Sequence, residues 1–215
     1  MPEAVNNKEL IPLEHYLELY KAADPVRMSE RTLAAYDPDQ RLFRVTFLER
    51  DYAVSWPDFE IRVLDQKDTY SPLLETNQAK ILVIRFLLEG SMLESTGKDL
   101  TYREVPWGEV YYRQFSGRCL TRMAFSYGKR IPDFAGGMEL LGAERISGAD
   151  AAYAVSVFPG YTVKFLLWAG DEDFPPSAQI LFSDNFAAAF HAEDLVVVSE
   201  IVLNALKVII KRKDK

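Results

Sequence analysis

The sequence predicts a single α+β domain over residues 1–215, in which an antiparallel sheet packs with helices and a long apolar helix ends the chain. Three observations predict this class. The 215 residues are 48% hydrophobic and 13% aromatic, which is enough to bury one stable core. Short β-rich runs occur between segments with helical periodicity. No repeat of fixed period and no low-complexity linker divides the chain.

The first third of the chain predicts two helices and then a meander. Apolar residues recur at helical spacing in the first helix: Leu13, Tyr16, Leu17 and Tyr20. Pro12 suits the start of this helix, and the pair at 24–25 is expected to end it. A second short helix is expected over residues 28–36, with Ser29 as its N-cap. Three β-rich runs then predict an antiparallel meander: residues 42–48, 52–56 and 59–64.

The middle of the chain predicts further helices. Residues 81–88 are apolar apart from Arg85, so the helix over residues 76–89 is expected to be nearly enclosed, and Gly90 is expected to end it. Residues 107–129 predict a helical segment that bends near Gly117. A short helix is also expected over residues 133–141.

The last third predicts a hairpin with a further strand. Residues 152–158 and 161–168 are rich in β-formers, and Pro159 and Gly160 between them are typical of a tight turn. Residues 179–182 predict one more strand. The sheet is therefore expected to combine the meander with this C-terminal hairpin.

The final helix is expected to begin at Glu193 and Asp194, whose charges suit the N-terminal end of a helix, and to finish at residues 211–213. Polar residues recur along one narrow stripe of it: Glu200, Asn204, Lys207 and Lys211. The apolar remainder, from Leu195 to Ile210, is expected to be buried or to form a homodimer interface. The stripe interrupts the roughly 20 apolar residues that a membrane span requires, so no membrane association is predicted.

Composition excludes several classes of protein. A formal net charge of -7 argues against a nucleic-acid partner, which would require a dominant basic face. The N-terminus lacks the basic and apolar regions of a signal peptide, and Cys119 is the only cysteine, so a cytoplasmic location is predicted. The glycines do not form a phosphate loop or a dinucleotide fingerprint.

Histidine chemistry has few candidates, because His15 and His191 are the only histidines. His15 is expected to be structural. His191 lies in sequence near Asp184, Glu193 and Asp194, and an imidazole with several carboxylates is a set that can bind a divalent cation. The alternative is that the acidic residues only complement the dipole of the final helix.

An acidic loop is the most distinctive local feature. Asp171, Glu172 and Asp173 follow an apolar strand and precede Pro175 and Pro176. Such a loop can bind a cation or an amine, although only Asp171 and Asp173 would share a ligand on an extended chain. The alternative is a polar turn in which Asp171 bonds its own backbone. No cofactor is firmly predicted, and a divalent cation is the one candidate.

A basic band crosses the middle of this acidic protein, and an anion or an acidic partner could bind there, especially at Arg113 and Arg118. Its members are Arg103, Arg113, Arg118, Arg122, Lys129 and Arg130. The alternative is that these residues pair with carboxylates of the same chain. A further hypothesis is a small-molecule site among the nearby aromatic residues: Trp107, Tyr111, Tyr112 and Phe115.

An ordered pattern near the C-terminus carries a family resemblance. It consists of a strand ending in Trp168-Ala-Gly-Asp-Glu172, then Phe174-Pro175, Ile180-Leu-Phe182, and Glu193-Asp194 at a helix start. Residues 81–88 and 105–115 fit more loosely. The chain thereby resembles a prokaryotic domain of unknown function that occurs mainly in anaerobes, alone or appended to an iron–sulfur domain of corrinoid-protein type. Ser183, before Asp184, departs from the usual pattern.

Two functions are predicted as alternatives. The resemblance implies a non-catalytic accessory or binding protein in anaerobic one-carbon or redox metabolism, with an iron–sulfur or corrinoid protein as its partner. The second is a metal-dependent hydrolase in which carboxylates and one histidine hold a divalent ion that activates water. The residues of that site would be Asp171, Asp173, Asp184, His191 and Glu193.

Overall fold

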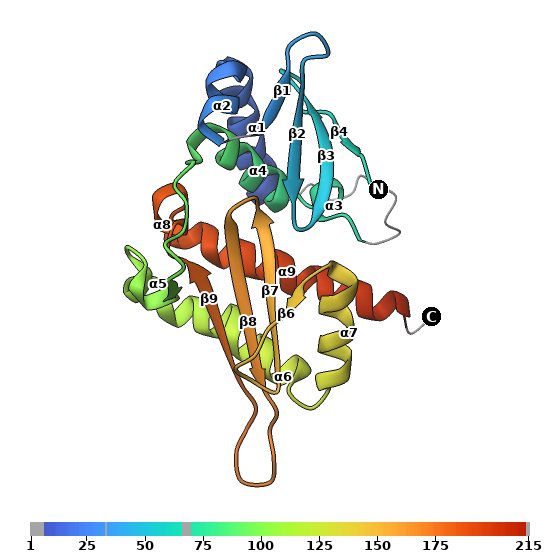
Figure 1. The fold of residues 1–215 in the computed structure, drawn as a ribbon, viewed down its shortest axis with the longest axis vertical. Helices are drawn as coiled ribbons and strands as arrows, with labels where there is room; N and C mark the ends of the chain where they lie inside the picture. The colour runs from blue at the N-terminus through green and yellow to red at the C-terminus, as the bar shows by residue number, and fades with distance from the viewer. Residues whose placement is uncertain (1–6, 33, 66–69, 214–215) are drawn as a thin grey trace.

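The computed structural model describes residues 7–32, 34–65 and 70–213 and confirms the α+β class (Figure 1). It contains two antiparallel sheets, with strand orders β1-β2-β3-β4 and β5-β9-β8-β7-β6. The predicted meander and the predicted hairpin therefore lie in different sheets. One hydrophobic core includes residues from both of them. Residues 1–6, which belong to the stretch that was tested for a signal peptide, lie outside the described residues.

The N-terminal part holds two helices and the first sheet. Its elements are α1 (Asn7–Ala22), α2 (Pro25–Thr32), β1 (Ala35–Asp37), β2 (Leu42–Phe47), β3 (Arg50–Ser55) and β4 (Ile61–Val63). Alternate residues of β2 point into the core, where Phe43, Val45 and Phe47 are buried. The meander is confirmed, and β1 adds a fourth strand at its edge by pairing with β2.

The predicted start of the first helix and both predicted ends of the second helix were wrong, whereas α1 ends at Ala22, before the pair at 24–25 as expected. Pro12 lies inside α1 and does not start it. Asp24 starts α2, because its carboxylate accepts a hydrogen bond from the Val26 amide at 2.9 Å, so Ser29 lies within the helix and is not its cap. The end of the expected 28–36 helix is instead strand β1. A capping side chain and strand pairing therefore outweigh the weak local helical pattern.

The tip of the β2–β3 hairpin joins the two sheets. Leu48 and Glu49 both have positive φ, 49° and 59°, which is the backbone geometry of a tight hairpin turn. The Leu48 amide donates to the Val157 carbonyl at 3.0 Å, and the Glu49 carboxylate accepts from the Ser156 amide at 3.0 Å. These contacts fix the first sheet against the edge of the second.

The predicted enclosed helix is α4 (Asn77–Glu89), preceded by the short α3 (Pro72–Glu75). Thr76 caps α4 by accepting from the Ala79 amide at 3.3 Å. Gly90 ends the helix, and a side chain there would collide with the Phe86 carbonyl at 2.3 Å. Six of its 13 residues are buried and only Glu89 is exposed, so the expected enclosure is confirmed.

The predicted bent helix is three consecutive helical segments: α5 (Gly108–Phe115), the π-helix Ser116–Thr121 and α6 (Arg122–Tyr127). Gly117 lies in the π-helix, so the irregularity occurs where it was expected. Before this segment lie the short strand β5 (Asp99–Thr101) and a 3₁₀ turn, Tyr102–Glu104. The predicted short helix is α7 (Ile131–Leu141).

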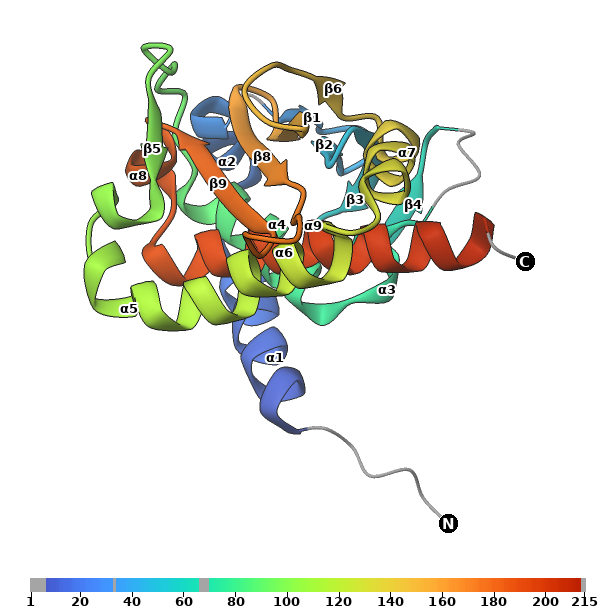
Figure 2. The same ribbon diagram turned by 90° about the horizontal axis from the view of Figure 1, so that it is seen from below.

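The second sheet is built around the predicted hairpin of β7 (Ala151–Phe158) and β8 (Tyr161–Trp168). β9 (Ser177–Ser183) and β5 extend the sheet on one side, and β6 (Glu144–Arg145) extends it on the other. Residues along β8 alternate between buried and half-buried positions. Seen from below, the segment containing α5 and α6 covers this sheet and lies beside the final helix (Figure 2).

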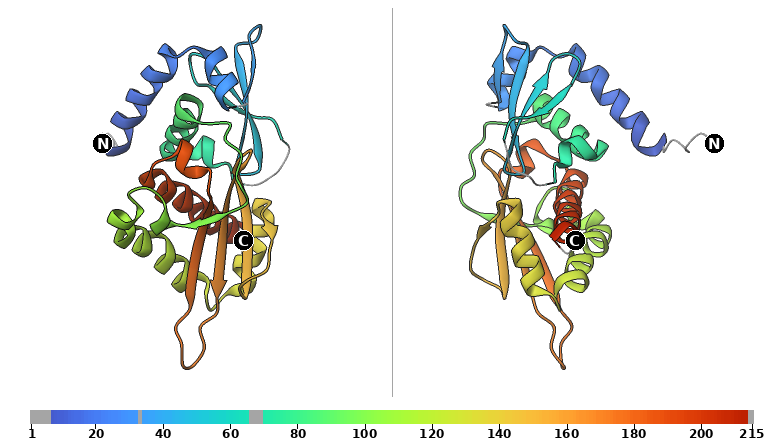
Figure 3. Two further views of the ribbon diagram at one scale, coloured as in Figure 1. Left: turned by 60° about the vertical axis from the view of Figure 1, so that its left-hand side comes forward. Right: turned by 90° about the vertical axis from the view of Figure 1, so that its right-hand side faces the viewer.

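The chain ends with α8 (Phe186–Ala189) and α9 (Ala192–Lys213). α9 contacts α4, α5, the π-helix and α7, so it lies between the two halves of the molecule (Figure 3). Most apolar side chains from Leu195 to Ile210 are buried within this chain, and Val197 and Val208 are half-buried. Their apolar character is thus explained without a second copy, and the homodimer stays a prediction.

The described helices include none that is long and apolar enough to cross a membrane.

Candidate functional site

The N-terminal end of α9 holds three of the predicted site residues, and Asp194 serves the fold there. One of its carboxylate oxygens accepts from the His191 amide at 2.9 Å, which closes the helix entrance. The other oxygen pairs with the Arg85 guanidinium at 2.5 Å. Asp194 is only 5% exposed. Since both oxygens bind groups of the protein, we assign Asp194 a structural role.

His191 and Glu193 lie at the same helix end, and both are exposed. The His191 carbonyl accepts from the amides of Asp194 and Leu195 at 3.0 and 3.3 Å. This residue therefore helps to start the helix through its backbone. The geometry favours the alternative in which the acidic residues complement the helix dipole.

Asp184 follows β9 and is held by a separate loop. Its carboxylate accepts hydrogen bonds from the Ser95 hydroxyl at 2.6 Å and from the Thr96 amide at 3.1 Å. The Thr96 hydroxyl also donates to it. These hydrogen bonds lower the pKa of Asp184 below its usual value, and the one from the Ser95 side chain has the largest effect. Asp184 therefore anchors the loop that contains Ser95 and Thr96.

The acidic loop projects at the far end of the hairpin (Figure 1). One Asp171 oxygen accepts from the amides of Asp173 and Phe174 at 2.9 and 2.7 Å, so Asp171 bonds its own backbone as the structural alternative expected. Asp173 and Glu172 are exposed. Phe174 beside them is 71% exposed.

The structure does not bring the residues of the hypothetical metal site together. The acidic loop precedes β9 and Asp184 follows it, so the length of the strand, roughly 20 Å, separates them. Within the described parts of the chain, no group of three or more histidine, cysteine or acidic side chains is arranged to hold a metal ion.

The basic band divides into residues with partners and residues without them. Arg118 forms an ion pair with Glu200 of α9, with two hydrogen bonds between the groups. Arg103 pairs with Glu109 at 3.5 Å and lies 3.8 Å from the ring centre of Tyr112. Arg113 is exposed and pairs with no carboxylate of the described chain.

The aromatic residues of this region do not form a common site. Phe115 is buried and stacks on Tyr102 in the core, with ring centres 4.0 Å apart. Trp107 is 74% exposed. Tyr112 is half-buried beneath Arg103. These aromatic residues therefore lie in different environments, and the hypothesis of a small-molecule site among them gains no support.

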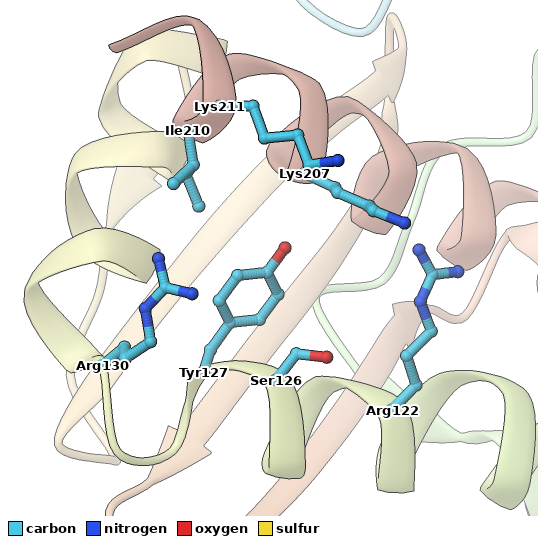
Figure 4. Close-up of a pocket in the computed structure, with 7 residues that line it drawn as sticks. All are labelled: Arg122, Ser126, Tyr127, Arg130, Lys207, Ile210 and Lys211. Atoms are coloured by element: carbon cyan, nitrogen blue, oxygen red, sulfur yellow. The ribbon is translucent and has the colours of Figure 1, made fainter. Parts of the chain in front are cut away.

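A basic groove forms where α6 meets the C-terminal half of α9 (Figure 4). It has a volume of about 500 Å³ and is lined by Arg122, Ser126, Tyr127, Arg130, Lys207, Ile210 and Lys211. α6 and the turn after it provide the first four of these residues, and α9 provides the rest. We call this feature the basic groove.

The polar stripe of α9 faces an oppositely charged residue at first, but at this groove it faces residues of the same charge. Glu200 meets Arg118, and the Asn204 side-chain oxygen accepts from Arg122 at 2.7 Å. Further along the same stripe, Lys207 and Lys211 line the groove with Arg122. In Figure 4 the side chains of Lys207 and Arg122 extend toward one another. The fold thus gathers cations at one place.

Negative charge is scarce in the groove. Arg130 pairs with Asp133 at 2.6 Å, but both groups are about half exposed, where such pairs contribute little. Asn204 leaves the charge of Arg122 uncompensated, and no described carboxylate lines the groove. The electrostatic field there favours an anion.

Tyr127 supplies a neutral donor in the middle of the groove. The residue is only 7% exposed, and its hydroxyl points into the space between the two helices (Figure 4). Among the described residues this hydroxyl has no hydrogen-bond partner. Burial raises the pKa of Tyr127, although Arg122 and Arg130 act in the opposite direction. The hydroxyl therefore keeps its proton at neutral pH and can donate a hydrogen bond to a bound anion.

The sequence analysis missed this site in part. Arg122 and Arg130 were in the predicted basic band, but Lys207 and Lys211 were assigned to a solvent-facing stripe, and Tyr127 was not considered. The available signal was the change of sign along that stripe, from Glu200 to two lysines spaced by one helical turn. Arg85 was also missed as the partner of Asp194.

Fold and site define an α+β protein with an anion-attracting groove at the contact between two helices. The chain belongs to the family described as domain of unknown function (DUF3786), whose family model matches residues 24–205. The predicted membership of a domain-of-unknown-function family is thereby confirmed. No curated protein and no solved structure matches the chain.

Proposed function

We propose that this protein is a non-catalytic binding protein that recognises an anionic group of its partner through the basic groove. One observation carries this proposal: the fold places Arg122, Arg130, Lys207 and Lys211 around one hollow that no described carboxylate lines. Like charges held together in the folded state oppose folding. A bound anion would offset that cost, so the arrangement suits a ligand better than it suits the unliganded fold.

The surroundings of Cys119 and His191 support a binding role. Cys119 is buried, and burial raises the pKa of its thiol to about 12, which leaves almost no reactive thiolate at neutral pH. His191 makes its described hydrogen bonds through its backbone. A binding protein requires neither group.

The metal-dependent hydrolase is the weaker alternative. It requires Asp171 and Asp173 to share an ion with Asp184, His191 and Glu193. The acidic loop lies at one end of β9 and the other residues follow its opposite end. Asp171 and Asp184 already accept hydrogen bonds from neighbouring groups. A divalent cation at any one of these carboxylates stays a prediction.

The partner that we propose is an iron–sulfur or corrinoid protein of anaerobic one-carbon or redox metabolism. The family resemblance supports this choice, and the basic groove supplies a surface that an acidic patch on such a protein would complement. In this accessory role the chain would act in the cytoplasm, where a single buried cysteine such as Cys119 stays reduced.

Affinity capture under anaerobic conditions tests the proposal. Wild type would be compared with Lys207→Glu and with Arg113→Glu, which changes the charge equally outside the groove. Captured proteins would be analysed for iron, acid-labile sulfide and cobalt. We expect wild type and Arg113→Glu to retain a metalloprotein that Lys207→Glu loses. Recovery of no such protein, or equal recovery with wild type and both variants, would contradict the proposal.

A further inference from the structure

We infer that the basic groove binds the diphosphate group of a small molecule, with Tyr127 as a central hydrogen-bond donor. This inference rests on the proposed function, because it takes the same groove as the binding surface. It adds the chemical class of the ligand. It also assigns roles to particular side chains on both helices.

Donors approach the groove from opposite walls. Arg122 and Tyr127 come from α6, and Lys207 and Lys211 come from α9. A carboxylate is planar and offers two oxygens on one side. A phosphoryl group is tetrahedral and offers oxygens in several directions, so it can accept from both walls at once. The arrangement of donors therefore favours phosphate over carboxylate.

The balance of charge favours two phosphoryl groups over one. Four cationic side chains line the groove, and Asp133 offsets part of the charge of Arg130. A single phosphate monoester carries roughly -1.5 to -2 at neutral pH and would leave part of this charge uncompensated. A diphosphate supplies more negative charge within a short span.

The central position of Tyr127 suits a bridging donor. Its hydroxyl lies between Arg130 and the convergent side chains of Arg122 and Lys207 in Figure 4. Because the ring is almost fully buried, the hydroxyl is held in place before a ligand arrives, and little conformational entropy is lost on binding. Ser126 lines the same wall and offers a second hydroxyl.

The dimensions of the groove indicate a small molecule. Its volume of about 500 Å³ is within the range of ordinary ligand pockets, roughly 300 to 1,000 Å³. Ile210 gives one apolar contact beside the cations, which suits an organic group attached to the diphosphate. The net charge of -7 over the whole chain disfavours a long polyanion, which would meet repulsion beyond the groove.

Calorimetric titration with inorganic pyrophosphate at low ionic strength tests the inference. Inorganic phosphate and citrate are the comparison ligands, because phosphate has one phosphoryl group and citrate has a similar charge on carboxylates. We expect pyrophosphate to bind at least about tenfold more tightly than either, since its second phosphoryl group accepts further charge-assisted hydrogen bonds. Equal binding of citrate and pyrophosphate would overturn the phosphate assignment, and equal binding of phosphate would overturn the diphosphate assignment.

Two variants and one control assign the residues. Tyr127→Phe keeps the ring and removes the hydroxyl, and Lys207→Gln removes one charge from an exposed position. Each is expected to weaken pyrophosphate binding about tenfold. Arg113→Gln loses the same charge outside the groove and should change binding less than about twofold. If Arg113→Gln weakened binding as much as Lys207→Gln, the attraction would be general and the inference would be wrong. Thermal unfolding would confirm that each variant is folded.

The results separate this inference from the proposed function. If a metalloprotein is captured through the groove but pyrophosphate neither binds nor competes, the diphosphate inference alone is wrong. If Lys207→Glu changes neither partner capture nor pyrophosphate binding, the groove is not the binding surface and both are wrong.

Discussion

Charged residues cluster at both ends of α9, but within the described chain they have counter-charges at one end and lack them at the other. At the N-terminal end, Asp194 is buried against Arg85 and also accepts a hydrogen bond from a backbone amide. At the C-terminal end, Lys207 and Lys211 line the basic groove, and no ion pair with a described carboxylate involves them. At the first end, Asp194 and Arg85 compensate each other's charge, although Nε of Arg85 has no hydrogen-bond partner among the described residues. The second end offers charge that the fold leaves uncompensated.

This difference shows which charged clusters indicate function. The residues around His191 and the acidic loop have the denser charge in sequence, but Asp171, Asp184 and Asp194 are committed to hydrogen bonds within the protein. The groove has fewer charged residues per segment, and they come from distant parts of the chain. A binding site is therefore better identified by charges that lack sufficient counter-charge than by charge density.

The largest expected effect comes from breaking the ion pair at the N-terminal end of α9. Asp194→Ala leaves the mostly buried Arg85 with only the half-exposed Glu89 as counter-charge, and it also removes the cap of α9. We expect the free energy of unfolding to fall by roughly 3 to 5 kcal/mol, as measured by urea denaturation. Glu193→Ala, at the exposed neighbouring position, is the control and should change stability by less than about 0.5 kcal/mol. Equal effects of the two variants would show that the Arg85 pair is not structural.

A smaller effect is expected in the acidic loop, which extends the comparison to a third region. Asp171→Ala removes an acceptor for two backbone amides and should lower the free energy of unfolding by about 1 kcal/mol. Glu172→Ala should have almost no effect, because this exposed side chain has no described partner. Stabilisation of wild type by millimolar Mg²⁺ or Mn²⁺ that Asp171→Ala abolishes would instead favour the metal site.

The smallest expected effect has the opposite sign. Lys207→Gln removes one member of the like-charge pair with Lys211, which lies one helical turn away. Without ligand, we expect the free energy of unfolding to rise by about 0.2 to 0.5 kcal/mol, with a smaller gain at high salt. Lys211→Gln is the matched control. Its gain should be smaller, because Lys211 lies in the last turn, where a positive charge favours the helix dipole. A loss of stability in Lys207→Gln would show that the groove is not strained by repulsion.

Local patterns predicted much of the secondary structure. The alternation in β2 and β8 and the turn at Gly160, whose φ is 82°, follow from side-chain period and from the conformational freedom of glycine. The short strands β1, β5 and β6 were not expected. Each has at most three residues, so its pairing depends on a neighbouring strand more than on its own sequence.

The candidate site was only partly predictable for a related reason. The band containing Arg122 was visible in the sequence, and so was the stripe containing Lys207. Their residues are about 80 positions apart in the chain, as the Arg122–Asn204 hydrogen bond illustrates with a separation of 82. No local period relates two helices at that distance, so their meeting could not be read from spacing.

The sequence by itself determined the α+β class, the positions of the long helices along the chain and the family, because periodicity and ordered motifs are local properties. Tertiary structure alone decided which charges are satisfied. Packing of α9 against α4 buried Asp194 beside Arg85, and packing of the same helix against α6 placed Lys207 beside Arg122 and Tyr127. Electrostatic pairing depends on distance in space, and the distances between these side chains arise only when the helices pack.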